Sequence, residues 1–358
     1  MSELDRAVTM AGHWLAPREL QAVPARGGHI NASYFVSEGA AQPRWLLQRI
    51  NREVFASPEQ VMRNIEAVLT GAMGVPDAGI ALPALLRTQS GHAWATDADG
   101  ELWRCWAVAP GLRSSARAHT ARDAHEAGRA FGAFARLATV LDASLLEETI
   151  PGFHDTPGRL ARFEASIARN MSGRAGRARE EIAQALQYRA LAPLLTAPLA
   201  SGQVPRRVTH NDAKIANVLF DAGSGRAVMV IDLDTVMPGT PLFDFGDLVR
   251  SSVSPAAEDA TDLATVEAEP AMYRALLEGY LEGTGGLLTP AERQLLEPAG
   301  RVITWEQAIR FLTDYLDGDL YFATTHREHN LERTRAQLAL LASLDRQQEE
   351  NRRLTRTS

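Results

Sequence analysis

The segment 208–232 constrains the fold more than any other part of the chain. Two β-rich runs, 218–220 and 227–231, flank a short stretch rich in Asp, Gly and Ser. If these runs pair as an antiparallel hairpin, the residue before the first strand lies beside the residue after the second. Asn217 and Asp232 would then meet, and an amide oxygen with a carboxylate suits Mg²⁺. The sequence therefore predicts a hairpin that builds a metal site.

The residues just before this hairpin have the spacing of a phosphoryl-transfer loop. They read His210-Asn-Asp212-Ala-Lys214-Ile-Ala-Asn217, which fits His-x-Asp-x-x-x-x-Asn. In such loops the Asp takes the proton of the substrate hydroxyl and the Asn holds a metal ion. We therefore predict Asp212 as the catalytic base, with Asn217 and Asp232 as metal ligands. We expect His210 to order the loop, because Asp212 already supplies the base.

Lys214 is the only lysine in the chain, whose other basic residues are arginines and histidines. A bias toward arginine commonly reflects genome composition. The position of the one lysine inside the predicted catalytic loop favours a functional role, because an ammonium there could stabilise charge on the transferred phosphoryl group. A single lysine at this position also excludes a P-loop.

Composition limits the class of protein and its partners. The 358 residues are 45% hydrophobic and 23% charged, which is ordinary for one large or two moderate globular domains. The net charge of -7 argues against a nucleic-acid partner, and the single Cys105 excludes an internal disulfide and a cysteine-based zinc site. We find no signal peptide and no apolar run of about 18 residues. We expect a cytoplasmic protein that binds small molecules and no membrane; the oligomeric state is not indicated.

The periodicity predicts two lobes of different class. Residues 26–108 have the order strand, strand, strand, helix, strand, strand, which indicates a small antiparallel sheet with one helix. The helix begins at Ser57, which forms a capping box with Gln60, and ends at Gly71. Four of the five predicted strands have assigned bounds, 33–36, 44–50, 82–88 and 102–108. Further helices are predicted at 121–140, 159–171, 179–191, 273–280, 290–296, 301–316 and 329–351.

We predict an α+β protein divided near Ala109–Gly111. Residues 1–108 would form a β-rich nucleotide-binding lobe. Residues 109–358 would form a larger, mainly helical lobe with the catalytic loop, the metal site and the acceptor pocket. The cleft between two such lobes is the expected nucleotide site.

The two-lobe order and the motif set resemble the aminoglycoside phosphotransferase and choline kinase family, which has a protein-kinase-like fold. The residues of these motifs are most similar to those of bacterial N-acetylhexosamine 1-kinases. The similarity spans nearly the whole chain, and its matching pieces are residues 28–31, 47–51, 149–154, 210–217, 231–239, 244–247 and 310–322.

The resemblance implies ATP- and Mg²⁺-dependent phosphorylation of a sugar hydroxyl, namely the anomeric hydroxyl of N-acetylglucosamine or N-acetylgalactosamine. It implies that Lys214 contacts phosphate and that Asp212 faces the sugar. It also implies three groups of binding residues: a loop over the ATP phosphates (Gly27, Gly28, His29, Ile30, Asn31 and Ser33), a hinge that reads adenine (Ala107 and Ala109), and sugar contacts (Arg310, Tyr321 and Asp234). For Asp234, a second metal contact and a solvated turn remain open.

The chain departs from the protein-kinase pattern on its third strand, which normally carries a lysine for the α- and β-phosphates. Gln48 stands in that place, beside Arg49. Adjacent strand residues face opposite sides of a sheet, so only one of them can point into the cleft. We favour Gln48 and keep Arg49 open. Glu66 is the candidate for the usual helix glutamate.

The tripeptide Asp244-Phe245-Gly246 has the same residues as the Asp-Phe-Gly metal motif of protein kinases, but not the same position in the chain. It lies far from Asn217 along the chain, and no hairpin brings the two together. We expect Asp244 to bond the backbone of the catalytic loop.

Two other functions remain open. The acceptor could be an aminoglycoside, choline, homoserine or another amino alcohol, with Glu306, Asp314, Asp317 and Asp319 forming a ring of carboxylates around the cation. The missing lysine also allows a catalytically weak, pseudokinase-like nucleotide-binding protein. The presence of Asp212, Asn217 and Asp232 argues against that second alternative.

Overall fold

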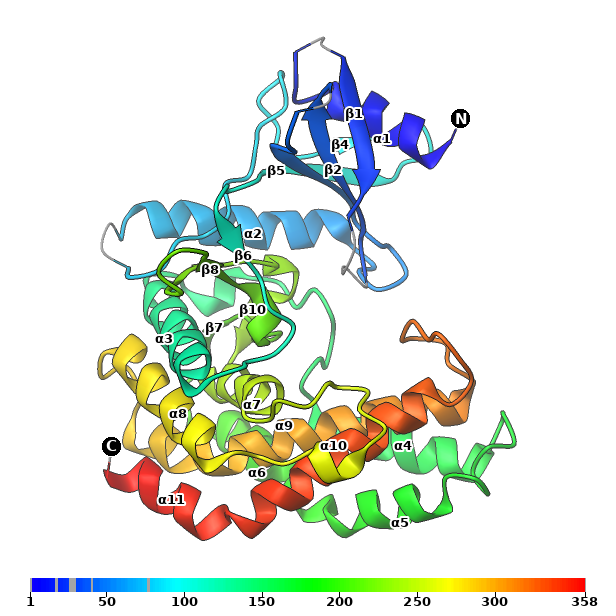
Figure 1. Cartoon of the computed structure of the whole chain (residues 1–358), viewed down its shortest axis with the longest axis vertical. Coiled ribbons are helices and arrows are strands. Elements are labelled where there is room, and N and C mark those ends of the chain that lie inside the picture. Colours follow the sequence, from blue (N-terminus) through cyan, green and yellow to red (C-terminus); the bar gives the residue numbers. More distant parts are fainter. Residues whose placement is uncertain (1, 17–18, 26–29, 40, 76–77, 358) are drawn as a thin grey trace.

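The structure is a computed structural model that describes residues 2–16, 19–25, 30–39, 41–75 and 78–357. It has two lobes (Figure 1). The N-terminal lobe contains a five-stranded antiparallel sheet in the order β1-β2-β3-β5-β4. Its elements are α1 (Glu3–Ala11), β1 (Leu20–Pro24), β2 (Ala32–Glu38), β3 (Trp45–Arg49), α2 (Pro58–Met73), β4 (Ala95–Thr96) and β5 (Leu102–Ala107).

The larger C-terminal lobe is mainly helical (Figure 1). Its helices are α3 (Ala121–Leu137), α4 (Thr156–Arg169), α5 (Arg179–Gln187), α6 (Pro193–Ala200), α7 (Pro241–Ser252), α8 (Pro270–Thr284), α9 (Pro290–Asp317), α10 (His329–Arg346) and α11 (Gln348–Thr357). Two small sheets lie under the N-terminal lobe: β7 (Arg207–Thr209) pairs with β10 (Met237–Gly239), and β8 (Val218–Asp221) pairs with β6 (Leu112–Arg113) and β9 (Ala227–Val230). No helix among the described residues is long and apolar enough to cross a membrane.

The hydrophobic core does not divide at the lobe boundary. One cluster fills the space between α1 and the sheet, around Trp14, Leu47 and Trp103. The other runs from the buried face of α2 through the whole C-terminal lobe. Helix α2 is therefore packed with the C-terminal lobe, although it follows β3 in the chain. The division at residue 108 remains a prediction about function, because the core itself crosses it.

Several predicted elements are confirmed and others are wrong. The 218–220 and 227–231 runs form the expected antiparallel hairpin, β8–β9. The segment 82–88 is not a strand: an isolated bridge joins Leu85 to Trp106, and a second joins Ala81, just before the segment, to Met229. Helices 290–296 and 301–316 are one helix, α9. Helix α2 continues past Gly71 to Met73, and Ser57 forms no side-chain cap. Strand β1 and helices α6 and α7 were not predicted.

Candidate active site

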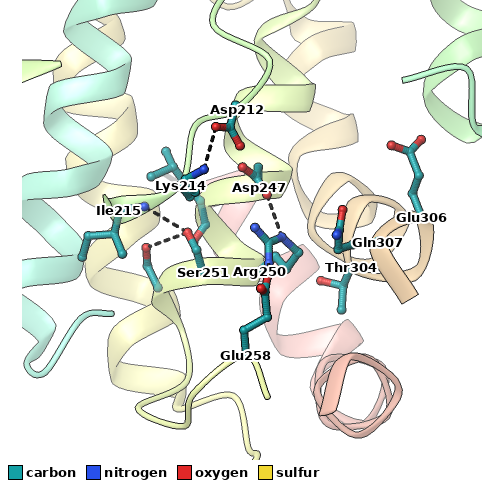
Figure 2. Close-up of polar contacts among 12 residues, drawn as sticks. Asp212, Lys214, Ile215, Asp247, Arg250, Ser251, Glu258, Thr304, Glu306 and Gln307 are labelled. Carbon is teal, nitrogen blue, oxygen red and sulfur yellow. Dashed lines mark hydrogen bonds and ion pairs between the residues drawn. The ribbon is translucent and has the colours of Figure 1, made fainter. Parts of the chain in front are cut away.

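The loop between β7 and β8 brings three predicted residues into contact. Lys214 Nζ lies 2.8 Å from Asp212 Oδ2. Asn217 Nδ2 donates to the Asp212 carbonyl oxygen at 2.8 Å and to Asp212 Oδ2 at 3.0 Å. A short 3₁₀ turn, Ile215–Asn217, directs Asn217 back toward the aspartate. Figure 2 shows the Lys214 side chain reaching the Asp212 carboxylate.

The charges in this loop stabilise one another. Burial raises the pKa of the Asp212 carboxyl, but the Lys214 charge and hydrogen bonds from Lys214 and Asn217 outweigh burial and hold this pKa well below its ordinary value. Burial lowers the pKa of the Lys214 ammonium, yet the charges of Asp212 and Asp232 outweigh it, so this pKa lies above its ordinary value. Asp212 is therefore an ionised acceptor beside a fixed cation at neutral pH.

Helix α7 supports this loop from below. Both carboxylate oxygens of the buried Asp244 accept backbone N–H groups, from Asn211 at 2.7 Å and from His210 at 3.0 Å. About two turns after Asp244 on the same helix, Ser251 Oγ accepts the Ile215 N–H at 3.2 Å (Figure 2). The predicted role of Asp244 is thereby confirmed. Phe245, the middle residue of the Asp244-Phe245-Gly246 tripeptide, is fully buried in the core.

His210 is fully buried and packs edge-on against two rings of α3, Phe131 and Phe134, with ring centres 5.1 and 5.5 Å away. Its Nε2 lies 3.0 Å from the Ile231 carbonyl oxygen, so Nε2 carries the proton and donates. This side chain joins the catalytic loop to the end of β9, as a loop-ordering histidine should.

The hairpin places Asp232 next to Asn217. The Ile231 N–H donates to the Asn217 carbonyl at 2.9 Å, which continues the β8–β9 pairing by one step. Asp232 then has a left-handed backbone with φ 65°. This conformation is uncommon for a residue other than glycine and occurs often at functional sites. Burial and the neighbouring charge of Asp234 raise the pKa of the Asp232 carboxyl to about 6.

These residues fit a hard divalent cation. The Asn217 Nδ2 is committed to Asp212, which leaves Oδ1 as its ligand atom. Burial, and after it the charges of Asp234 and Asp212, raise the pKa of the Asp232 carboxyl, and a divalent cation bound here would offset this unfavourable grouping of carboxylates. The described residues contain no group of three or more His, Cys, Asp and Glu arranged for a metal. Mg²⁺ commonly takes one or two carboxylates and fills its remaining positions with phosphate oxygens and water.

On the nucleotide-facing side, Gly27, Gly28 and His29 lie outside the described residues. Ile30 is exposed, and its carbonyl accepts a hydrogen bond from Asn51 Nδ2 at 3.2 Å. At the predicted hinge, Ala107 ends β5, and its N–H donates to the Ala84 carbonyl at 2.9 Å. The next N–H, of Val108, donates to the Arg44 carbonyl at 2.9 Å. These bonds leave Ala109 as the next hinge donor along the chain.

Gln48 and Arg49 point to opposite faces of the sheet. Arg49 lies over the Trp103 ring and near Glu3 of α1, on the face away from the C-terminal lobe. Gln48 Nε2 donates to Ser33 Oγ on β2 at 3.1 Å. Gln48, and not Arg49, therefore faces the catalytic lobe. Glu66 of α2 pairs with Arg87, and its assignment as the helix glutamate stays a prediction.

Arg104 is the residue of this site that sequence reasoning missed. It lies on β5 directly opposite Gln48, and its side chain is only 1% exposed. The Arg104 Nη1 lies 2.5 Å from Asp234 Oδ1, and Asp234 Oδ2 accepts from Asn31 Nδ2 at 2.6 Å. Asp234 is therefore a buried link between the lobes, and the solvated-turn interpretation is wrong. A charged residue inside the apolar run of β5 was the only local signal.

The predicted sugar contacts lie on and beyond the end of α9. The Arg310 guanidinium lies over two rings, Phe153 at 5.1 Å and Phe322 at 5.6 Å. Burial and the nearby charge of Arg310 lower the pKa of Arg159 to about 10. Tyr321 is half-exposed next to Phe322. Two arginines and three aromatic rings therefore gather in one place.

His154 connects this group to the catalytic loop. Its Nε2 donates to the Asn211 carbonyl at 2.9 Å, and its Nδ1 lies 2.8 Å from Glu306 Oε1 on α9. Arg310 follows Glu306 by four residues, which places both on one face of the helix. A cavity of about 860 Å³ lies elsewhere, between α2 and the segment 78–87; neither Asp212 nor Arg310 lines it.

Comparison with known proteins identifies the family. Residues 21–288 match the model of the phosphotransferase enzyme family. Solved structures with the same fold include a microcompartment-associated aminopropanol kinase (16% identity, TM-score 0.61, 97% of this chain and 98% of that chain covered). Others are the GDP complex of aminoglycoside 2'-phosphotransferase-IIIa (13%, 0.62, 94% and 99%) and a choline/ethanolamine kinase family protein from Mesorhizobium loti (15%, 0.51, 99% and 99%). The chain is thus a small-molecule phosphotransferase that belongs to the aminoglycoside phosphotransferase and choline kinase family, with its protein-kinase-like fold.

Proposed function

We propose that this protein is an ATP- and Mg²⁺-dependent kinase that phosphorylates the anomeric hydroxyl of an N-acetylhexosamine and releases the sugar 1-phosphate. The observation that carries the proposal is the Asp212 carboxylate, held between Lys214 and Asn217 in the catalytic loop. Support for the acceptor comes from the arginine and aromatic group around Arg310.

Asp212 would accept the hydrogen bond of the attacking hydroxyl and take its proton. Because its pKa is low, Asp212 is a weak base, and its main contribution is to orient the hydroxyl. Phosphoryl transfer through a loose transition state depends mostly on such positioning. Lys214 would stabilise negative charge on the transferred phosphoryl group.

Asn217 and Asp232 would hold Mg²⁺. When bound, this ion supplies positive charge to the nucleotide phosphates. The loop from Gly27 to Ser33 would cover the phosphates, and Ala107 and Ala109 would read adenine through their backbone groups.

The acceptor pocket favours a neutral acceptor over a cationic one, because a positive charge beside Arg159 and Arg310 would be repelled. Guanidinium groups can instead donate to sugar hydroxyls and to an acetyl oxygen. The rings of Phe153, Tyr321 and Phe322 offer apolar faces for a sugar ring.

The four carboxylates that could attract a cation are already engaged. Asp314 accepts the N–H groups of residues 320–322 and a bond from Asn330. Asp319 pairs with Arg174, and Asp317 accepts from Ser166. Glu306 bonds His154 and Thr156. These contacts weaken the alternative of an amino-alcohol or aminoglycoside acceptor.

The test combines an acceptor screen with a catalytic variant. ADP release is followed with N-acetylglucosamine, N-acetylgalactosamine, choline and kanamycin, and ³¹P NMR identifies the phosphorylated position. We expect a sugar 1-phosphate from the hexosamines. Asp212→Asn should lower kcat by about 10²–10⁴-fold, while the exposed control Asp142→Asn should behave as wild type. Turnover of choline or kanamycin alone would refute the hexosamine acceptor, and wild-type kcat in Asp212→Asn would refute the role of Asp212.

A further inference from the structure

The face of the N-terminal sheet that looks toward the catalytic lobe carries a closed ring of polar contacts. Arg104 Nε and Nη2 donate to Gln48 Oε1 at 3.0 and 2.9 Å. Gln48 Nε2 donates to Ser33 Oγ, and Ser33 Oγ lies 3.3 Å from the Asn31 carbonyl. Asn31 and Arg104 both contact Asp234. The ring therefore joins the segment after Gly27-Gly28 to the residue two positions after Asp232.

The orientation of the Gln48 amide is fixed inside this ring. Its Oε1 accepts three hydrogen bonds, from two nitrogens of Arg104 and from Trp106 Nε1 at 2.9 Å. A flipped amide would set its NH₂ group against three donors. The Nε2 donor group must therefore point away from Arg104, toward Ser33 and the start of β2.

Arg104 also places a permanent charge behind this donor. Its guanidinium is buried and lies over the Trp106 ring at 5.2 Å. A charge in such a site needs a partner, and Asp234 supplies it. Together, Gln48 and Arg104 provide a directed N–H donor and a cation on the strands where a lysine is absent.

We propose that Arg104 is a positioning residue that aims the Gln48 N–H group at the nucleotide phosphates and couples it to the metal loop through Asp234. Together, Gln48 and Arg104 replace the third-strand lysine that would contact the α- and β-phosphates, with the cation on β5 and the donor on β3. This inference rests on the proposed use of ATP. It does not depend on the identity of the acceptor.

The experiment measures the binding of ATP and of adenosine, without acceptor, by titration calorimetry. Arg104→Lys keeps the charge but cannot donate twice to Gln48 while it pairs with Asp234. We expect about a tenfold or greater loss of ATP affinity, the cost of weakening one hydrogen bond to a charged group. Adenosine affinity should stay within about twofold, because adenosine lacks the phosphates.

A double variant tests the assignment by moving the cation. Arg104→Met should bind ATP more weakly than Arg104→Lys and should be less stable, since Asp234 loses its partner. Adding Gln48→Lys restores a cation on the third strand, near Asp234, and should recover most of the lost ATP affinity. Arg6→Lys is the matched control, because Arg6 is a largely buried arginine of the same lobe that pairs with Asp97 outside the cleft.

Three results would separate the possibilities. Equal losses for ATP and adenosine in Arg104→Lys would show that Arg104 only supports the fold, and would overturn the inference. If Arg104→Met does not fold, Arg104→Lys still decides, with its unfolding midpoint as the check. If wild type binds adenosine and ATP equally, or neither, the proposed kinase function fails before the Arg104 assignment is reached.

Discussion

Asp244 lies beneath the catalytic loop, where each of its carboxylate oxygens accepts one backbone N–H. The side chain is fully buried, so no water can replace either bond. Burial raises the pKa of Asp244, and the two backbone N–H bonds act in the opposite direction. The position of Asp212 therefore depends on this one side chain in the first turn of α7.

The variant Asp244→Asn should destabilise both the fold and the site. One oxygen becomes an NH₂ group that faces a backbone N–H, so a buried donor loses its acceptor. We expect a loss of about 1–3 kcal/mol in the free energy of unfolding and a lower kcat with little change in nucleotide affinity. Urea unfolding and steady-state kinetics measure the two effects. Asp142→Asn, the exposed control, should match wild type in both measurements; a wild-type midpoint for Asp244→Asn would contradict the supporting role.

Local spacing predicted the residues of the catalytic loop but not their partners in the other lobe. Asn217 and Asp232 could be placed together because a hairpin is a short-range structure, and β8–β9 has that pairing. The Arg104–Asp234 contact joins residues 130 positions apart in the chain. Nothing in the sequence near Arg104 specifies the loop that will supply its carboxylate.

At the scale of elements, four glycines bring α3 and α8 into backbone contact. A Cβ on Gly128 or Gly132 would lie 2.3–2.4 Å from a carbonyl oxygen of α8. A Cβ on Gly279 or Gly283 would lie 2.0–2.3 Å from one of α3. Each pair is spaced by four residues, so each lies on one helix face. Helix α3 also carries the phenylalanines that pack on His210, which links this crossing to the catalytic loop.

Gly132→Ala should therefore push two helices apart. The added methyl group gains up to ~1 kcal/mol of helix propensity, but a contact of 2.4 Å with backbone cannot be relieved by a side-chain rotation. We expect a net loss of about 1–3 kcal/mol, as for other overpacked sites. Thermal unfolding tests it against Gly176→Ala, where nothing lies within 4 Å of an added Cβ. Equal midpoints for the two variants would contradict the close approach.

The errors in predicting elements have physical causes. Helices 290–296 and 301–316 were predicted as separate elements, and Pro298 and Gly300 lie between them, yet α9 continues through both. Gly300 is needed there because Val249 of α7 packs against it, with Cγ1 2.7 Å from where a Cβ would be. Segment 82–88 has the composition of a strand but forms only an isolated bridge, between Leu85 and Trp106. The secondary structure of such segments depends on tertiary packing, which the local sequence pattern does not specify.

At the scale of the whole molecule, buried side-chain contacts join the two lobes in addition to the covalent chain. Asp234 of the C-terminal lobe contacts Asn31 and Arg104 of the N-terminal lobe. Asn64 of α2 donates to the Val236 carbonyl at 2.9 Å. The loop at 232–236, which carries the proposed metal ligand Asp232, is thus held by three residues of the other lobe.

Asp234→Asn should loosen both lobes at once. Removing one partner of a buried ion pair costs about 3–5 kcal/mol, and here the pair crosses the cleft. We expect faster amide hydrogen exchange in β5 and in the loop 232–236 together. Glu297→Gln is the matched control, because it breaks the buried pair with Arg301 inside one helix. It should lower stability without changing exchange in β5; exchange confined to one lobe in Asp234→Asn would contradict the coupling.

The solitary lysine has a practical consequence for labelling chemistry. Lys214 is the only side-chain amine in the chain, and its side chain is one-third exposed beside Asp212. A succinimidyl ester dye therefore has one side-chain target, which lies in the catalytic loop, and the raised pKa of Lys214 keeps that amine protonated and slow to react. Among side chains, amine conjugation of this protein would therefore be slow and would modify only the candidate catalytic loop. Conversely, a lysine introduced on the far surface would become the faster of only two side-chain conjugation sites.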